Sequence, residues 1–561
     1  MNLLWVFYLK EINNKLIFSM FEELRYLICL RTTIIFKISM KQTQLNVEQR
    51  NRLNFKSTWI IFVLALLMFE FSQGQNKSGK ILDAVSKEPI AYASILVNKS
   101  VHLISNGEGD FSISDQINQA NTTFDVSYLG YVSQTISIEQ LRNKNYIITL
   151  QPSIYELNPV EVGKSKLDPL EIMQQVKANL NKNYSQELIA SKERLFIRKG
   201  NDFTPKTLEV ALTKSSDFSK SALSKMNSDI QHIVTNLKQF PPKEYTDLLG
   251  NYYCYPQPNQ SKYFAASKLE VLQATLLKTD QNNLSATDLK KEAMNVLLKH
   301  LDSTKYYRVK SGLFGSRDTI SLRKDFNDKK NKIKKNIVSQ TKENIKKFLI
   351  ENSLQHITSF DFVHHPERYN YKFGGVTYDE NSQATYVLTF DPKTSKGKFH
   401  GKIYVSDTDF AILRLSYELA PNKQLNNINL KFLLGIKAGE NIQKGVVVFD
   451  KKRNQSNYSL RYAKSEHGNY FYVNRPLKFI ELTKKDKDVV ALDLKIDGTT
   501  TSSTEFLVMS SETISTTAGQ QIQEKNFSYV PLKAYDAKIW KNYNALEPIQ
   551  SLKKFKSIDN Q

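Results

Sequence analysis

The stretch Pro89-Ile-Ala-Tyr-Ala-Ser-Ile-Leu-Val97, with Gly107-Glu-Gly-Asp-Phe-Ser-Ile113 after it, decides the fold of the chain that follows residue 76. Both runs are short, alternate apolar and polar side chains, and are bounded by turn residues, which is the pattern of strands with one buried face. Similar runs follow at 123–131, 134–138 and 146–150. About seven short strands in about 75 residues, with connections of hairpin length, predict a compact antiparallel β-sandwich.

The second run also predicts a tight turn. Gly107 and Gly109 tolerate a positive φ, which such turns often require. Phe111 is expected to point into the core. Asp110 either caps the backbone of its own turn or binds calcium, and capping is the commoner role of a lone acidic turn residue.

This order of motifs resembles the carboxypeptidase regulatory-like domain, which stands at the front of many exported envelope proteins, including TonB-dependent receptors. The resemblance covers residues 77–162. It implies an all-β, prealbumin-like, seven-stranded sandwich that serves as a folding and interaction module and not as a catalyst. Asn106 departs from the family, whose members usually carry Thr or Ser there. The motif residues that carry the resemblance are Gly79, Asp83, Pro89, Gly107, Gly109, Asp110, Phe111, Gly130 and Tyr131.

Residues 40–74 have the pattern of a secretory signal peptide. Basic side chains precede an apolar run at 59–69, and small residues follow it at Ser72 and Gly74. The run is shorter than the roughly 20 apolar residues of a spanning helix, although an uncleaved membrane anchor is the alternative. Residues 1–39 are interpreted as an extension upstream of a true start at Met40, or as a disordered one. We therefore expect an exported protein of the periplasm or the outer membrane.

Composition limits the class of protein further. The 561 residues include 31 Phe and 28 Tyr, which argues against a wholly disordered chain. The net charge is +22, and removing residues 1–74, with nine basic and five acidic side chains, lowers it to +18. Two cysteines, Cys29 and Cys254, exclude a disulfide scaffold and a Cys-rich metal site. Export would leave Cys254 alone.

The rest of the chain is predicted to be an α+β body with a helical middle and a large antiparallel sheet. Residues 165–355 read as mainly helical, because Asp168-Pro-Leu-Glu171 is a helix start and apolar residues recur at helical spacing at 172–180, 260–280 and 284–301. Within this region 192–212 reads as a strand. Period-two alternation dominates residues 356–511, and residues 512–561 are interpreted as a docked C-terminal extension.

The most basic stretch runs from Arg323 to Lys347, with ten basic and three acidic residues above an apolar stripe. A helix of this kind suits an anionic membrane surface, and the alternative is a solvated face packed on its own domain. Nucleic acid is not expected as a partner of an exported chain. Aromatic clusters at 252–255 and 369–378 suit either a glycan platform or, more commonly, a core.

No catalytic constellation stands out in the sequence. His364 and Glu367 lie three residues apart, and His467 follows a hundred residues later, which superficially matches a zinc peptidase. Pro366 and the surrounding strand pattern do not suit such a site, so these three residues are weak metal candidates only. Neither a cofactor nor a metal is expected.

The leading hypothesis is therefore a non-enzymatic binding or scaffold protein of the cell envelope, with an envelope protein or a glycan as partner. The alternatives are an accessory component of a TonB-dependent outer-membrane transport system and, less favoured, a zinc peptidase or glycan-processing enzyme.

Overall fold

The computed structural model describes eleven segments of the chain, all within the compact unit Asn76–Gln561. The predicted extension at 1–39, the signal at 40–74, the helix at 284–301 and the basic residues 323–335 lie outside them. Among the described helices none is both long and apolar enough to cross a membrane. The described segments are 77–154, 168–184, 188–215, 219–259, 262–279, 306–311, 314–321, 336–379, 383–451, 456–482 and 487–557.

The first segment folds as two sheets around one core. The strands β4 (Asp110–Ile113), β1 (Lys77–Asp83) and β7 (Ile147–Leu150) form one sheet in that order. The other sheet has the order β3 (Val101–Ile104), β2 (Ser94–Val97), β5 (Thr123–Ser127) and β6 (Gln134–Ser137). Helix α3 (Ile138–Asn143) closes the core, which contains Ile81, Ile95, Phe111, Phe124 and Ile148.

The predicted antiparallel arrangement is wrong at one place in this sandwich. Strand β7 pairs with β1 in parallel, with Lys80 opposite Ile147 and Asp83 opposite Leu150. The remaining strand pairs of the two sheets are antiparallel. Connections of hairpin length predict antiparallel neighbours, but β1 and β7 are separated by the rest of the domain, so no hairpin constrains their direction.

The turn before β4 is stabilised by a different residue from the one predicted. Gly109 adopts the positive φ of +77°, while Gly107 does not lie in that region. The side chain of Asn106 accepts hydrogen bonds from the backbone N–H of Glu108 (2.8 Å) and Asp110 (2.9 Å). The Asp110 carboxylate instead pairs with Lys80 at 2.7 Å. The residue that departs from the family therefore caps the turn, and Asp110 acts as a partner of β1.

The body is built on one fourteen-stranded mixed sheet. Its main path runs β13-β14-β15-β16-β18-β19-β20-β8-β9-β10-β21, and β11, β12 and β17 pair beside it. All its pairs are antiparallel except β10 with β21. The strands are β8 (Ser191–Ser215), β9 (Lys243–Asn259), β10 (Lys262–Lys278), β11 (Tyr306–Ser311), β12 (Phe314–Ser321), β13 (Tyr369–Tyr378), β14 (Ala384–Pro392), β15 (Phe399–Ser406), β16 (Ile412–Leu419), β17 (Leu425–Leu430), β18 (Ile436–Lys451), β19 (Tyr458–Glu481), β20 (Lys487–Thr513) and β21 (Val530–Leu532).

The prediction that residues 165–355 are mainly helical is wrong for the part of this region that the structure describes. The strand at 192–212 is present as part of β8, but β9 and β10 are also long strands, and together they join the sheet of residues 356–511. In β10, Leu269 and Val271 pack in a cluster on one face of the sheet, while Leu272 packs in a cluster on the other. Because both faces are apolar, the period of two is hidden and the spacing resembles a helix.

Helices cover one face of the sheet. Helix α4 (Pro169–Tyr184) starts as predicted, with Ile172, Met173, Val176 and Leu180 buried. It packs with α8 (Ile337–Glu351) and α9 (Asp361–His364) in one cluster that includes Leu195 and Ile197 of β8. Helix α5 (Lys220–Gln239) covers the outer part of β8 and β20. The other short helices are η1 (Pro366–Arg368), α10 (Lys431–Leu434), α11 (Thr516–Gln521), η2 (Ala537–Trp540) and α12 (Gln550–Lys553).

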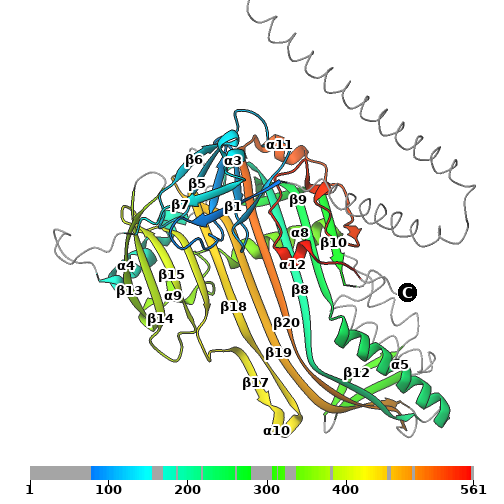
Figure 1. The fold of residues 1–561 in the computed structure, drawn as a ribbon. Coiled ribbons are helices and arrows are strands. Elements are labelled where there is room, and N and C mark those ends of the chain that lie inside the picture. The colour runs from blue at the N-terminus through cyan, green and yellow to red at the C-terminus, as the bar shows by residue number, and fades with distance from the viewer. Residues whose placement is uncertain are drawn as a thin grey trace, which may run out of the picture. The chain divides into compact units, whose positions relative to one another are not determined.

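The opposite face of the sheet meets the sandwich and the C-terminal segment (Figure 1). Phe196, between Leu195 and Ile197 on β8, packs on this side against Trp540, with ring centroids 5.5 Å apart. The C-terminal segment also bonds to both neighbours. Asn106 of the sandwich donates to the carbonyl of Pro548 at 3.1 Å, and buried Arg198 of β8 donates to the carbonyl of Leu546 at 3.1 Å. Residues 537–548 therefore fasten the sandwich to the sheet.

Candidate ligand-binding site

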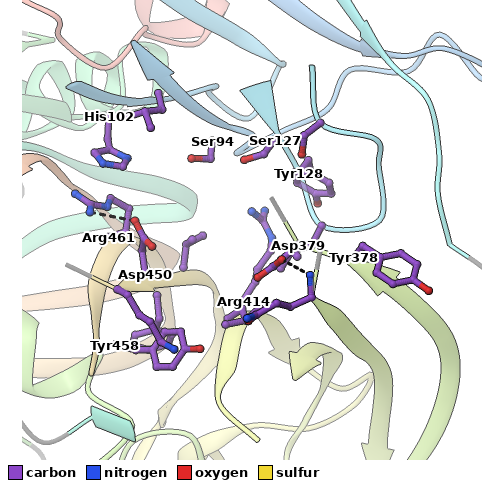
Figure 2. Close-up of a pocket in the computed structure, with 18 residues that line it drawn as sticks. Ser94, His102, Ser127, Tyr128, Tyr378, Asp379, Arg414, Asp450, Tyr458 and Arg461 are labelled. Atoms are coloured by element: carbon purple, nitrogen blue, oxygen red, sulfur yellow. Dashed lines mark hydrogen bonds and ion pairs between the residues drawn. The ribbon is translucent and has the colours of Figure 1, made fainter. Parts of the chain in front are cut away.

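A cavity of about 260 Å³ lies where the four-stranded sheet of the sandwich faces the large sheet (Figure 2). The sandwich contributes Ser94 of β2 and His102 of β3, whose neighbours Ile95 and Leu103 point the other way into the sandwich core. This alternation follows from the period of two along a strand. The body contributes residues from the end of β13 and from β16, β18 and β19.

Arg414 of β16 is the central cation of this site. It alternates with Leu413 and Leu415, which pack under the helices, so its side chain points to the sandwich face. Only 6% of Arg414 is exposed. One guanidinium nitrogen donates to the carbonyl of Tyr92 at 2.8 Å, and the guanidinium carbon lies 4.4 Å from the ring centre of Tyr128.

These contacts leave most of the Arg414 donors available. A guanidinium has five N–H groups in a planar fork. Within the described part of the chain, one of them is used in a hydrogen bond, and no carboxylate forms an ion pair with this guanidinium. A buried charge is normally compensated by an opposite charge. Arg414 also lines a second cavity of about 390 Å³, on the side of Tyr131 and Lys402.

A second arginine, Arg461, lines the same cavity. Arg461 donates to Asp450 at 3.1 Å and to the carbonyl of Val508 at 3.1 Å. Its Nε is buried and has no hydrogen-bond partner in the described structure. Across the cavity, burial and the charge of Arg461 lower the pKa of His102 from 6.5 to about 3. His102 is therefore neutral at physiological pH, and its ring offers one donor and one acceptor.

The rest of the lining carries hydroxyl groups, one lysine and the carboxylates of Asp379 and Asp450, of which Asp379 accepts a hydrogen bond from the backbone N–H of Gln383 at 2.8 Å. Ser94, Ser127 and Tyr128 come from the sandwich, and Tyr458 comes from β19. Lys451 pairs with Asp409 at 3.5 Å, and the Tyr458 hydroxyl donates to the same carboxylate at 3.1 Å. Burial, followed by the charge of Asp409, raises the pKa of Tyr458, so its hydroxyl stays protonated. The cavity thus combines three cationic side chains (Arg414, Arg461 and Lys451) with two carboxylates and neutral hydrogen-bonding groups.

The three weak metal candidates are not brought together as a site. The Nδ1 of His467 lies 2.9 Å from the Glu440 carboxylate, which accepts the hydrogen bond, on the β18–β19 pair. Glu367 is an exposed side chain beside His365 and Arg368. His364 is buried in α9, where burial lowers its pKa. Across the described segments, no group of three or more His, Cys, Asp or Glu side chains could hold a metal ion.

The motif residues of the sandwich act mainly in its packing. A Cβ at Gly79 would overlap the ring of Phe111, and a Cβ at Gly109 would lie 2.8 Å from the carbonyl oxygen of Ile81. Pro89 forms an isolated bridge to Leu82. Asp83 accepts hydrogen bonds from the backbone of Val85 and Ser86 and from the Tyr131 hydroxyl (2.7 Å). Gly130, with φ of +99°, donates to Thr377 of the body at 3.1 Å. Gly107 lies against the Tyr92 hydroxyl.

Of the two other partner candidates, the basic stretch is described only from residue 336 onward, with three of its ten basic side chains, and the aromatic cluster at 252–255 is packed in the body. In the described part of the basic stretch, Lys342 of α8 pairs with Glu524 at 2.8 Å and Lys347 with Glu351 at 3.5 Å. Val338, Ile345 and Phe348 of the same helix are buried. The aromatic cluster at 252–255 is also buried at its three tyrosines, as is Tyr369, whereas Tyr378 is exposed and lines the junction cavity.

Sequence reasoning missed Arg414, Arg461 and His102. A signal was present for Arg414, because the strand 410–417 is apolar on both sides of one arginine. A charged residue inside such a strand indicates a buried partner or a ligand. The signal for His102 is weaker, since its neighbourhood depends on Arg461, more than 350 residues away in the sequence.

Comparison with known proteins supports the assignment of the sandwich. Residues 77–162 match the family model of the CarboxypepD_reg-like domain, the same residues that carried the resemblance in the sequence. No protein with a curated description matches the chain. Among solved structures, a DUF1329 family protein from Desulfovibrio piger ATCC 29098 is similar at 8% identity, over 61% of this chain and 93% of that chain, with a TM-score of 0.16. That score is too low to indicate a shared fold.

Proposed function

We propose that this chain is an exported, non-enzymatic binding protein of the cell envelope that holds a small anionic ligand between its sandwich and its large sheet. The observation that carries the proposal is Arg414, a buried guanidinium that faces two cavities without a carboxylate partner in the described residues. The signal pattern at 40–74 supports export. In this proposal the sandwich, of prealbumin-like type, acts as one wall of the site.

The chemistry of the cavity favours a carboxylate or phosphate group. An arginine fork binds either group through two parallel hydrogen bonds, which are stronger than bonds between neutral groups. Arg461, which pairs with Asp450, adds a second guanidinium to the lining. Neutral His102 and the serine hydroxyls then bind the uncharged part of the ligand. A cavity of about 260 Å³ suits a ligand smaller than a typical cofactor, whose pockets are about 300–1,000 Å³.

Hydrogen bonds across the junction hold the sandwich and the large sheet together, which supports a scaffold role as well as a binding site. Asn106, Ser114 and Arg414 bond across it, to Pro548, Asn544 and Tyr92 respectively. These bonds lie in buried surroundings and keep the two walls of the cavity in register. A site held in this way is preorganised, so a ligand need not order it on binding.

Ligand-induced thermal stabilisation of the full chain tests this function. Acetate, inorganic phosphate and galacturonate serve as probes of increasing size. A bound probe raises the melting temperature, because binding to the folded state at a hundred times Kd stabilises it by about 3 kcal/mol. Arg414→Gln is expected to abolish the shift, and Arg142→Gln, which removes an arginine bonded to Asn118 outside the cavity, is expected to keep it.

The comparison uses the shift caused by the probe and not the melting temperature itself, because Arg414 also fastens the junction. Arg414→Lys keeps the charge but loses the fork, so it is expected to bind more weakly than the native chain and more strongly than the glutamine variant. Equal shifts in the native chain and Arg414→Gln would contradict the proposed site.

A further inference from the structure

The turn between β17 and β18 exposes three large apolar side chains. Phe432 of α10 is fully exposed, and Ile428 and Leu430 of β17 are 54% and 39% exposed. Strand β17 pairs with β18 at the end of the sheet, and its residues after Leu425 are all exposed. Single exposed apolar residues are common on protein surfaces, but three within five residues form a patch.

The surroundings of this patch are basic and aromatic. Residues 420–439 contain three lysines and no acidic residue, and the neighbouring residues 468–478 of β19 add Arg475 and Lys478, also without an acidic residue. The Lys431 ammonium lies 4.3 Å from the ring centre of Tyr472, and the Lys437 ammonium lies 4.9 Å from that of Tyr470. From the tip inward, the side chains are therefore first apolar and then tyrosines paired with lysines.

We propose that this tip, residues 428–437, docks the protein on an anionic lipid bilayer by inserting Phe432 into the interface. Apolar side chains enter the acyl boundary, tyrosines sit at the level of the headgroups, and lysines bind the negative surface. A bilayer fits better than a protein groove, because the patch is at the end of a strand pair and both charged side chains within residues 428–437, Lys431 and Lys437, are cations. The nearest acidic residue along β18, Glu440, lies beyond the tip and 2.9 Å from His467. The charge complements that of anionic lipid.

This docking is separate from the ligand site. Val446 of β18 lies at the junction and Ile436 begins the same strand at the tip. Ten residues at about 3.3 Å each place these two positions of the strand roughly 33 Å apart. A protein held at the tip would leave the junction cavity free to exchange its ligand, so the two sites can be disabled independently.

Flotation of the full chain with lipid vesicles tests the proposal. Vesicles of phosphatidylcholine with phosphatidylglycerol are expected to retain the native chain, and pure phosphatidylcholine vesicles to retain it less. Phe432→Ser is expected to lower the partition coefficient about tenfold or more, from the apolar area withdrawn from the bilayer. Lys431→Glu with Lys437→Glu is expected to abolish the preference for anionic vesicles, and Phe432→Trp to preserve retention.

The matched control is Val85→Ser, which removes an apolar side chain that is 75% exposed on the sandwich. It is expected to bind as the native chain does. Because Phe432 is fully exposed, its replacement does not threaten the fold, and the apolar run 59–69 is common to all variants. Failure of both vesicle types to retain the native chain, or equal retention of Phe432→Ser, overturns the proposal. So does a dimer that Phe432→Ser converts to a monomer without any vesicle binding, since the tip would then serve a second copy.

Discussion

Replacing His102 with glutamine tests whether the junction holds a neutral imidazole. Burial, followed by the charge of Arg461, lowers the pKa of His102 from 6.5 to about 3. The unfolded chain therefore binds a proton near pH 6.5 that the folded chain does not bind until about pH 3. Above pH 6.5 this group leaves folding unaffected, and as the pH falls from 6.5 toward 3 it destabilises the folded state increasingly.

The expected size follows from the two pKa values. Between pH 7 and pH 5 the proton taken up by His102 in the unfolded state costs the folded state about 2 kcal/mol. Urea unfolding at both pH values measures this loss for the native chain and for His102→Gln. The variant is expected to lose about 2 kcal/mol less, because its side chain does not titrate.

The control is His232→Gln, which replaces an exposed histidine of α5. It is expected to lose as much stability as the native chain over the same pH range. Carboxylates that titrate in this range contribute equally to all three proteins and cancel in the comparison. If His102→Gln lost as much stability as the native chain, the description of His102 as a buried neutral ring beside Arg461 would be refuted.

Three further substitutions test the packing. Asp247→Ala leaves Arg198 buried without its bidentate partner and is expected to lower the free energy of unfolding in urea by about 3–5 kcal/mol. The double variant Arg198→Met with Asp247→Leu is expected to recover most of that loss. A loss below about 1 kcal/mol in Asp247→Ala would argue against a buried pair. Trp540→Ala is expected to lower the free energy of unfolding by about 3–5 kcal/mol and to speed proteolysis between the sandwich and the sheet. An unchanged cleavage rate would contradict the role of Trp540 in holding the C-terminal segment against β8. Gly79→Ala is expected to cost about 1–3 kcal/mol by displacing Phe111, and a melting temperature equal to the native one would show that the core yields freely.

Local patterns predicted the parts of the fold whose causes are local. The sandwich motifs, the helix that starts at Pro169 and the strand within 192–212 all follow from alternation, capping and turn residues near them in the sequence. The hairpin of β9 and β10 did not follow, because apolar residues on both of its faces imitate a helix. The region boundary at residue 355 failed for the same reason.

The candidate site is beyond local patterns. Arg414 lies beside Tyr92, 322 residues earlier, and Asn106 bonds to Pro548, 442 residues later. Such contacts depend on which face of the large sheet the sandwich covers, and no periodicity encodes that choice. The arginine inside the apolar strand 410–417 was the available hint, since an unpaired charge among apolar residues requires a partner.

Native mass spectrometry of the full chain purified from cell envelopes tests the central claim most directly. We expect the native chain to carry a small molecule with a carboxylate or phosphate group, Arg414→Gln purified in the same way to lack it, and Arg142→Gln to retain it. A native chain whose mass shows no such adduct, or an adduct of equal occupancy in Arg414→Gln, would contradict the claim that the junction of the sandwich and the sheet is an anion-binding site.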